Sequence, residues 1–176
     1  MGGRVDLTEN CDLKSLKEKF CKCLKLTIEK EAYLIEKDVS ERAIAHKLAE
    51  YLQKEFQDYN VDCEYNRKYD EVKLRSDRER GFVPDIIVHK RGTDENLMIV
   101  ELKKTGRRKN EEKERLKEAI NDPLKYCLGV YVELRMRQSS NKVNEVCYFS
   151  RDGLIEDCFE SCSNGQAWRD RCMSGS

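Results

Sequence analysis

Two acidic residues stand at the outer ends of neighbouring apolar runs in this sequence. Asp85 begins the run 85–89 and Glu101 ends the run 97–101, with a polar turn between them. Such runs predict two strands joined as a β-hairpin. If the turn centres on Thr93, Asp85 faces Glu101 with their Cβ atoms about 4.5–5.5 Å apart.

The chemistry of this pair follows from the apolar residues around it. Ile86, Val88, Met98 and Val100 line one face of the hairpin, and Ile87, Leu97 and Ile99 line the other. A strand pair that is apolar on both faces lies inside a covered sheet. Two facing carboxylates there need a shared proton or a cation. Mg²⁺ fits, because it favours one or two carboxylates together with waters and phosphate oxygens, and Mn²⁺ is a substitute.

Basic residues follow the acidic pair. Lys103 lies two positions beyond Glu101, so we expect it on the same face, roughly 6.6–7 Å along the strand. An ammonium group there can orient a water or neutralise charge on a phosphoryl group. We predict phosphate contacts from Lys104, Arg107, Arg108 and Lys109, and a second groove wall from Arg67, Arg78 and Arg80, with Tyr65 and Tyr69 as stacking surfaces.

A glutamate precedes these strands on a predicted helix. Its apolar positions Ile44, Leu48, Leu52 and Phe56 recur every four residues, and three positions before Ile44 is Glu41, which should therefore point toward the core. An alternative interpretation makes Glu41 the N3 residue of a capping box that begins at Asp38.

The motif Pro84-Asp85, fifteen residues, then Glu101-Leu102-Lys103 resembles the signature of the PD-(D/E)XK nuclease superfamily. The resemblance extends from about Glu41 to residue 134. It implies a restriction-endonuclease-like α/β fold, a central mixed sheet in the order αβββαβ flanked by helices.

The resemblance also implies roles for the residues. Asp85 and Glu101 would ligate Mg²⁺ together with the backbone carbonyl of Leu102. Lys103 would act on the attacking water, and Glu41 would hold a water or a second metal.

The remaining pattern predicts a single domain over residues 1–176. It has an N-terminal helical extension (1–37), a nuclease-like core (38–150) and a C-terminal tail (151–176). We expect helices within 12–37, from about 38, and over 111–121; strands over 61–66, 128–134 and 144–150; an irregular charged segment over 67–81; and a short helix over 154–162.

Composition limits the other possibilities. The 34 basic residues balance 34 acidic ones, which excludes a histone-like mode of binding. The longest apolar runs have four residues and the first residues form no apolar signal region, so we expect a cytoplasmic protein without membrane contact. The nine cysteines are an odd number, so we expect reduced thiols. Zinc binding by Cys158, Cys162 and Cys172 is an alternative, and His46 and His89 should have surface or turn roles.

The expected function is that of a metal-dependent nuclease that hydrolyses phosphodiester bonds, with DNA as the expected substrate. One such site cuts one strand, so duplex cleavage calls for a homodimer or two successive events. The alternatives are a catalytically inactive nuclease-fold module that binds nucleic acid or a partner protein, and a structural or regulatory subunit.

Overall fold

A computed structural model describes the backbone of residues 11–64, 67–68, 71–72, 74–75, 78–81, 83–105, 109–121, 125–139, 142–151 and 157–160. Side chains are described for residues 11–64, 83–105, 110–121, 125–139 and 142–151. The helices are α1 (Leu13–Lys30), α2 (Ala32–Glu36), α3 (Glu41–Glu55) and α4 (Lys109–Ile120). The longer strands are β1 (Asn60–Cys63), β6 (Ile86–His89), β7 (Asn96–Lys104), β8 (Leu128–Leu134), β9 (Val143–Ser150) and β10 (Asp157–Glu160).

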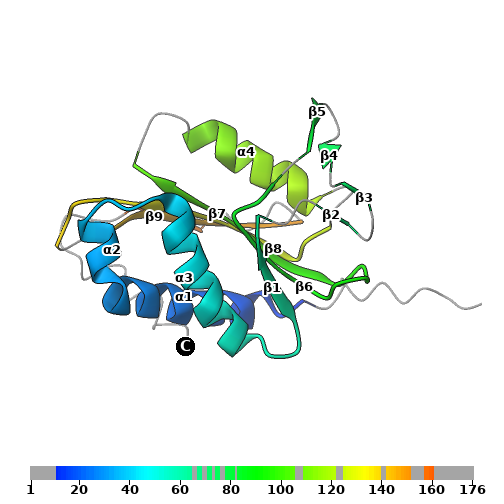
Figure 1. The fold of residues 1–176 in the computed structure, drawn as a ribbon. Coiled ribbons are helices and arrows are strands. Elements are labelled where there is room, and N and C mark those ends of the chain that lie inside the picture. Colours follow the sequence, from blue (N-terminus) through cyan, green and yellow to red (C-terminus); the bar gives the residue numbers. More distant parts are fainter. Residues whose placement is uncertain are drawn as a thin grey trace, which may run out of the picture.

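These longer strands form one sheet in the order β1-β6-β7-β8-β9-β10. Neighbouring strands are antiparallel except β7 and β8, which are parallel and are connected through α4. Helices α1 to α3 cover one face of the sheet and α4 covers the other (Figure 1). The predicted α/β class with a mixed, helix-flanked sheet is therefore confirmed, and the arrangement is compatible with a nuclease-like core.

Local signals explain where the first helices begin. The Asp12 carboxylate accepts a hydrogen bond from the Ser15 N–H (3.1 Å) and caps α1. The Ser40 hydroxyl accepts from the Ala43 N–H (3.3 Å) and caps α3. Each bond satisfies a donor that the first helical turn leaves without an intrahelical partner.

The sheet separates two apolar clusters. The larger lies under α1 to α3 and includes the predicted stripe of α3 and the hairpin residues Ile86, Val88, Met98 and Val100. The smaller lies under α4 and includes Ile87 and Ile99. The prediction for Leu97 was wrong, because it packs with the larger cluster. A β-bulge pairs His89 with Asn96 and leaves Leu97 out of the alternation.

Two other predictions differ from the structure. The segment 67–81, expected to be irregular, contains the two-stranded pairs β2 (Arg67–Lys68) with β3 (Glu71–Val72) and β4 (Leu74–Arg75) with β5 (Arg78–Gly81). Residues 157–160, expected within a helix, form β10, because β9 offers an open edge for antiparallel pairing. No helix in the described parts of the chain is long and apolar enough to cross a membrane.

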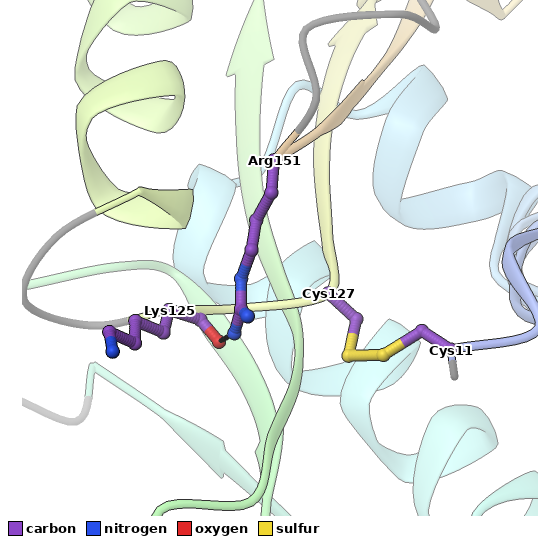
Figure 2. Close-up of a disulfide and its surroundings, with 4 residues drawn as sticks. All are labelled: Cys11, Lys125, Cys127 and Arg151. Carbon is purple, nitrogen blue, oxygen red and sulfur yellow. Dashed lines mark hydrogen bonds between the residues drawn. A yellow bond between two sulfur atoms is a disulfide. The ribbon is translucent and has the colours of Figure 1, made fainter. Parts of the chain in front are cut away.

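One disulfide joins distant parts of the chain. Cys11 is bonded to Cys127, across 116 positions of sequence, and this fastens the segment before α1 to the start of β8 (Figure 2). The Arg151 side chain, at the end of β9, donates to the Lys125 carbonyl close by. The prediction of reduced thiols throughout was therefore wrong for this pair, which only folding brings together. The side chains of Cys158, Cys162 and Cys172 lie outside the described residues.

Candidate active site

The β6–β7 hairpin brings the predicted acidic pair together. Ile86 pairs with Val100, Ile87 with Ile99 and Val88 with Met98, so the predicted register is confirmed from Ile86 to Val88. Asp85 lies one residue before β6, and its Oδ2 accepts a hydrogen bond from the Leu102 N–H at 2.8 Å. This bond holds the Asp85 carboxylate against β7, beside Glu101.

Lys103 lies between the two carboxylates, on the face of β7 that the sequence predicted. Its Nζ is 2.9 Å from Oε1 of Glu101 and 3.8 Å from Oδ2 of Asp85. The Glu101 side chain is 7% exposed and the Lys103 side chain 27%, so this ion triad has a buried end and an open end. A ligand would reach the triad from the lysine side.

Burial dominates the electrostatics of the triad. Loss of hydration, together with the Asp85 charge, raises the pKa of Glu101 to about 7. Burial also raises the pKa of Asp85, against the opposing effects of Lys103 and the Leu102 N–H. Burial alone would lower the pKa of Lys103, but the charges of Glu101 and Asp85 outweigh it and raise that pKa. The lysine is therefore held as a cation.

One atom of the triad lacks a protein partner. Oε2 of Glu101 is buried and accepts no hydrogen bond. A buried carboxylate oxygen without a partner is costly, and a cation at this position would remove the cost. Among the described residues, no group of three or more His, Cys, Asp or Glu side chains could hold a metal ion. A cation here would therefore rest on the Asp85–Glu101 pair and backbone oxygen, as predicted with the Leu102 carbonyl.

Glu41 is tied to the same strand. Its Oε1 accepts a hydrogen bond from the Lys104 N–H at 2.8 Å. Its charge raises the pKa of Asp85, so the two carboxylates lie within electrostatic reach of each other. The capping-box interpretation was wrong, because Ser40 is the N-cap of α3 and Glu41 is the first helical residue.

The predicted phosphate-binding lysine Lys104 has a structural partner. Its Nζ donates to Oδ1 of Asp38 at 2.7 Å, and Arg137 pairs with Oδ2 of the same aspartate at 3.0 Å. These bonds connect the loop before α3 with the end of β7 and the β8–β9 turn.

The other basic residues predicted to contact phosphate have side chains outside the described part of the structure. Arg107, Arg108, the Lys109 side chain, Tyr65 and Tyr69 lie outside the described residues, as do the side chains of Arg67, Arg78 and Arg80. They remain predictions.

Two residues near the site were missed by the sequence reasoning. Glu112, on α4, is 8% exposed and accepts from Nη1 of Arg115 on both oxygens, at 3.0 and 3.2 Å. Glu112 stands four positions before the buried Leu116, so the spacing that located Glu41 could also have found it. The second residue, Arg42, follows Glu41 directly and pairs with Glu64 at 2.5 Å.

Arg42 is exposed at the start of α3, next to Glu41. Its side chain is 79% exposed, and its partner Glu64 donates a backbone N–H to the Asp85 carbonyl at 3.1 Å. The pair therefore spans the two segments that carry Glu41 and Asp85. Only the fold brings residues 42 and 64 together, so no local signal in the sequence pointed to them.

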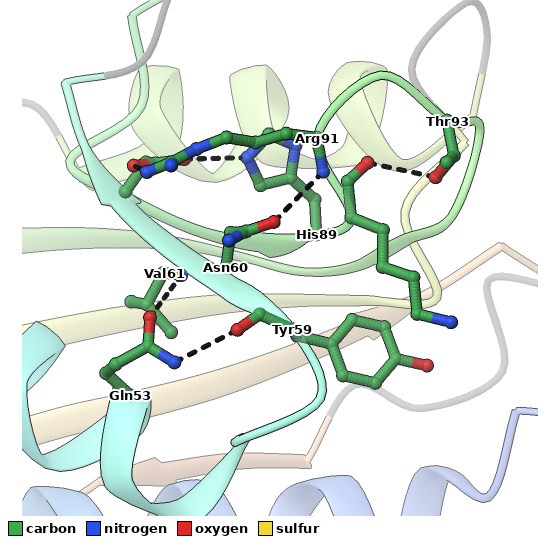
Figure 3. Close-up of polar contacts among 9 residues, drawn as sticks. Gln53, Tyr59, Asn60, Val61, His89, Arg91 and Thr93 are labelled. Atoms are coloured by element: carbon green, nitrogen blue, oxygen red, sulfur yellow. Dashed lines mark hydrogen bonds and ion pairs between the residues drawn. The ribbon is translucent and has the colours of Figure 1, made fainter.

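The histidines lie apart from the triad. His46 is exposed and pairs with Glu50 on α3, as expected. His89 is 4% exposed, so the expectation of a surface role was wrong. Its Nε2 lies 2.8 Å from Oδ2 of Asp62, which also accepts from Arg91 (Figure 3). These bonds connect β1 with the end of β6 that lies away from Asp85, which indicates a structural role.

Comparisons with known proteins give no further guide: no family model, no curated protein and no solved structure matches this chain.

Proposed function

We propose that this chain is a metal-dependent nuclease that hydrolyses phosphodiester bonds in nucleic acid, with DNA as the first substrate to test. The observation that carries the proposal is the triad: Lys103 lies 2.9 Å from Glu101 and 3.8 Å from Asp85, while Oε2 of Glu101 is buried without a partner. Glu41, on the adjacent helix, adds a third carboxylate within electrostatic reach of Asp85.

Asp85, Glu101 and the Leu102 carbonyl would hold Mg²⁺ in this proposal. The ion supplies positive charge that stabilises the phosphoryl oxygens in the transition state. Asp85 is well placed for this, because the Leu102 N–H fixes one of its oxygens against the strand. Oε2 of Glu101, which has no hydrogen-bond partner, would bind the ion from the buried side.

Lys103 acts as a cation in this site. In the metal-free protein the two carboxylates raise its pKa, which keeps it protonated. It donates hydrogen bonds, orients the attacking water, and stabilises negative charge that develops on the phosphoryl group. Glu41, fixed by the Lys104 N–H, accepts a hydrogen bond from a water on the helix side.

The proposal is tested with plasmid, linear duplex, single-stranded DNA and RNA, each incubated with Mg²⁺, Mn²⁺ or EDTA. We compare wild type with Lys103→Ala and with Lys90→Ala. Lys90 is a suitable control because it is also ion-paired, with Glu95, but at the other end of the same hairpin.

Cleavage by wild type and Lys90→Ala, lost in EDTA and reduced at least about 100-fold in Lys103→Ala, supports the proposal. Equal cleavage by Lys103→Ala contradicts the role of the lysine. Nucleic-acid binding without cleavage under any condition would replace the proposal with an inactive module of the same fold.

A further inference from the structure

We infer that Glu112, on α4, is a positioning residue of the triad: its negative charge increases the affinity of Asp85 and Glu101 for a divalent cation. This inference rests on the proposed function, because it concerns the same site. It adds a residue that lies outside the motif Pro84-Asp85…Glu101-Leu102-Lys103.

The placement of α4 brings Glu112 over the site. Leu116 and Ile120 of α4 are buried with Ile99 and Tyr131 in the smaller apolar cluster. Glu112 lies four positions before Leu116, so it continues the same buried stripe toward the end of the sheet that carries the triad.

A neighbouring contact fixes this placement independently. Tyr131 of β8 is the direct partner of Glu101 on β7. The Nζ of Lys113, the residue after Glu112, lies 5.3 Å from the centre of the Tyr131 ring. The first turns of α4 therefore lie over the Glu101–Tyr131 pair.

The alternation of β7 agrees with this placement. Glu101 and Lys103 follow Ile99 on the face of β7 that α4 covers, and Ile99 packs with Leu116 and Ile120, so the beginning of α4, which carries Glu112, lies toward Glu101 and Lys103. Glu112 forms no ion pair with Lys103 within 4.0 Å among the contacts of the described residues. Its own partner is Arg115, one turn along the helix.

The charge balance shows what this arrangement favours. Around the site, the described carboxylates include Glu41, Asp85, Glu101, Glu112 and the fully buried Glu133, whose strand position pairs with that of Lys103. The site is therefore rich in negative charge, which favours a bound cation. Oε2 of Glu101, buried without a partner, marks the position at which a cation would bind.

Glu112 is not itself a ligand in this inference. No group of three acidic, histidine or cysteine side chains among the described residues is arranged to hold a metal. Its effect is exerted through its charge, on the scale of the 10- to 100-fold changes in affinity that residues behind metal ligands commonly produce.

The test measures Mn²⁺ affinity of the full chain by electron paramagnetic resonance, without nucleic acid. Glu112→Gln is compared with Glu111→Gln and Glu112→Asp. Glu111 is an exposed neighbour in the same first turn of α4, so both glutamine variants change the helix dipole interaction alike. We expect an increase of about tenfold in the Kd of Glu112→Gln, an unchanged Kd for Glu111→Gln, and near wild-type affinity for Glu112→Asp.

A Kd that is the same in Glu112→Gln and wild type overturns the inference and leaves the proposed nuclease function standing. An equal loss in Glu111→Gln also overturns it, since a general helix effect would then explain the change. Wild type that binds no Mn²⁺ overturns both the inference and the proposed metal dependence. Wild type that binds Mn²⁺ but cleaves no nucleic acid contradicts only the proposed function.

Discussion

Replacement of Glu101 by glutamine should stabilise the metal-free protein at alkaline pH. The wild-type carboxyl is 6% exposed, and its burial beside Asp85 raises its pKa from 4.5 to about 7. The folded state therefore binds this proton more tightly than the unfolded chain does. Between pH 4.5 and 7 the folded state keeps the proton while the unfolded chain loses it, so the free energy of unfolding falls as pH rises.

The magnitude follows from the size of this pKa change. Each pKa unit corresponds to 1.36 kcal/mol, so the ionised carboxylate costs about 3 kcal/mol of stability above pH 7. Glutamine has nearly the same shape and does not ionise. We therefore expect Glu101→Gln to be more stable than wild type by about 3 kcal/mol at pH 8 and equally stable near pH 4. In a domain of this size, that difference raises Tm by about 6–12 °C.

The assay is denaturant unfolding in EDTA from pH 4 to pH 9, with Glu95→Gln as the control. Glu95 lies at the turn of the same hairpin and pairs with Lys90, outside the triad. The reasoning is refuted if the curves of wild type and Glu101→Gln stay parallel across this range, or if Glu95→Gln gives the same gain. Excess Mg²⁺ should selectively stabilise wild type at high pH, because it would bind the ionised Glu101 carboxylate of the folded state, which glutamine lacks.

Three further predictions concern the surroundings of the triad. Glu41→Gln keeps an oxygen that can accept the backbone N–H at the end of β7, so stability should change by less than about 0.5 kcal/mol while Mg²⁺-dependent cleavage falls; unaltered cleavage would remove this residue from the site. Neutralising Arg107 and Arg108 together should reduce the slope of the logarithm of the nucleic-acid binding constant against the logarithm of salt concentration by about two, measured by fluorescence anisotropy. An unchanged slope would place the phosphates elsewhere. Asp62→Ala removes the carboxylate that lies 2.8 Å from the buried His89 ring, so the free energy of unfolding at pH 7 should fall by about 1–3 kcal/mol. Cleavage per folded molecule should stay normal, and a catalytic defect would show that this cluster is more than structural.

Local pattern was sufficient for the elements that carry the triad. Two continuous apolar runs and the polar turn between them determined the hairpin, and centring that turn on Thr93 gave the register found from Ile86 to Val88. The register in turn placed Asp85, Glu101 and Lys103 at one end of the hairpin. The four-residue spacing of α3 turned Glu41 toward the core in the same way.

Contacts between distant segments had to come from the tertiary structure. The Cys11–Cys127 disulfide and the Arg42–Glu64 pair join positions with no local signal of their proximity. Strand β10 forms because β9 presents an open edge, although its own sequence has weak pattern.

The charge environment of the site is also a tertiary property. From sequence, Lys104 was one more cation of a basic run, yet in the fold it pairs with Asp38. Glu112 was one more charge on a polar helix, yet in the fold it is buried above the triad. Residue type and spacing determine which face a side chain occupies, whereas its burial and its partners depend on the segments that pack against that face, and these decide its pKa and its chemistry.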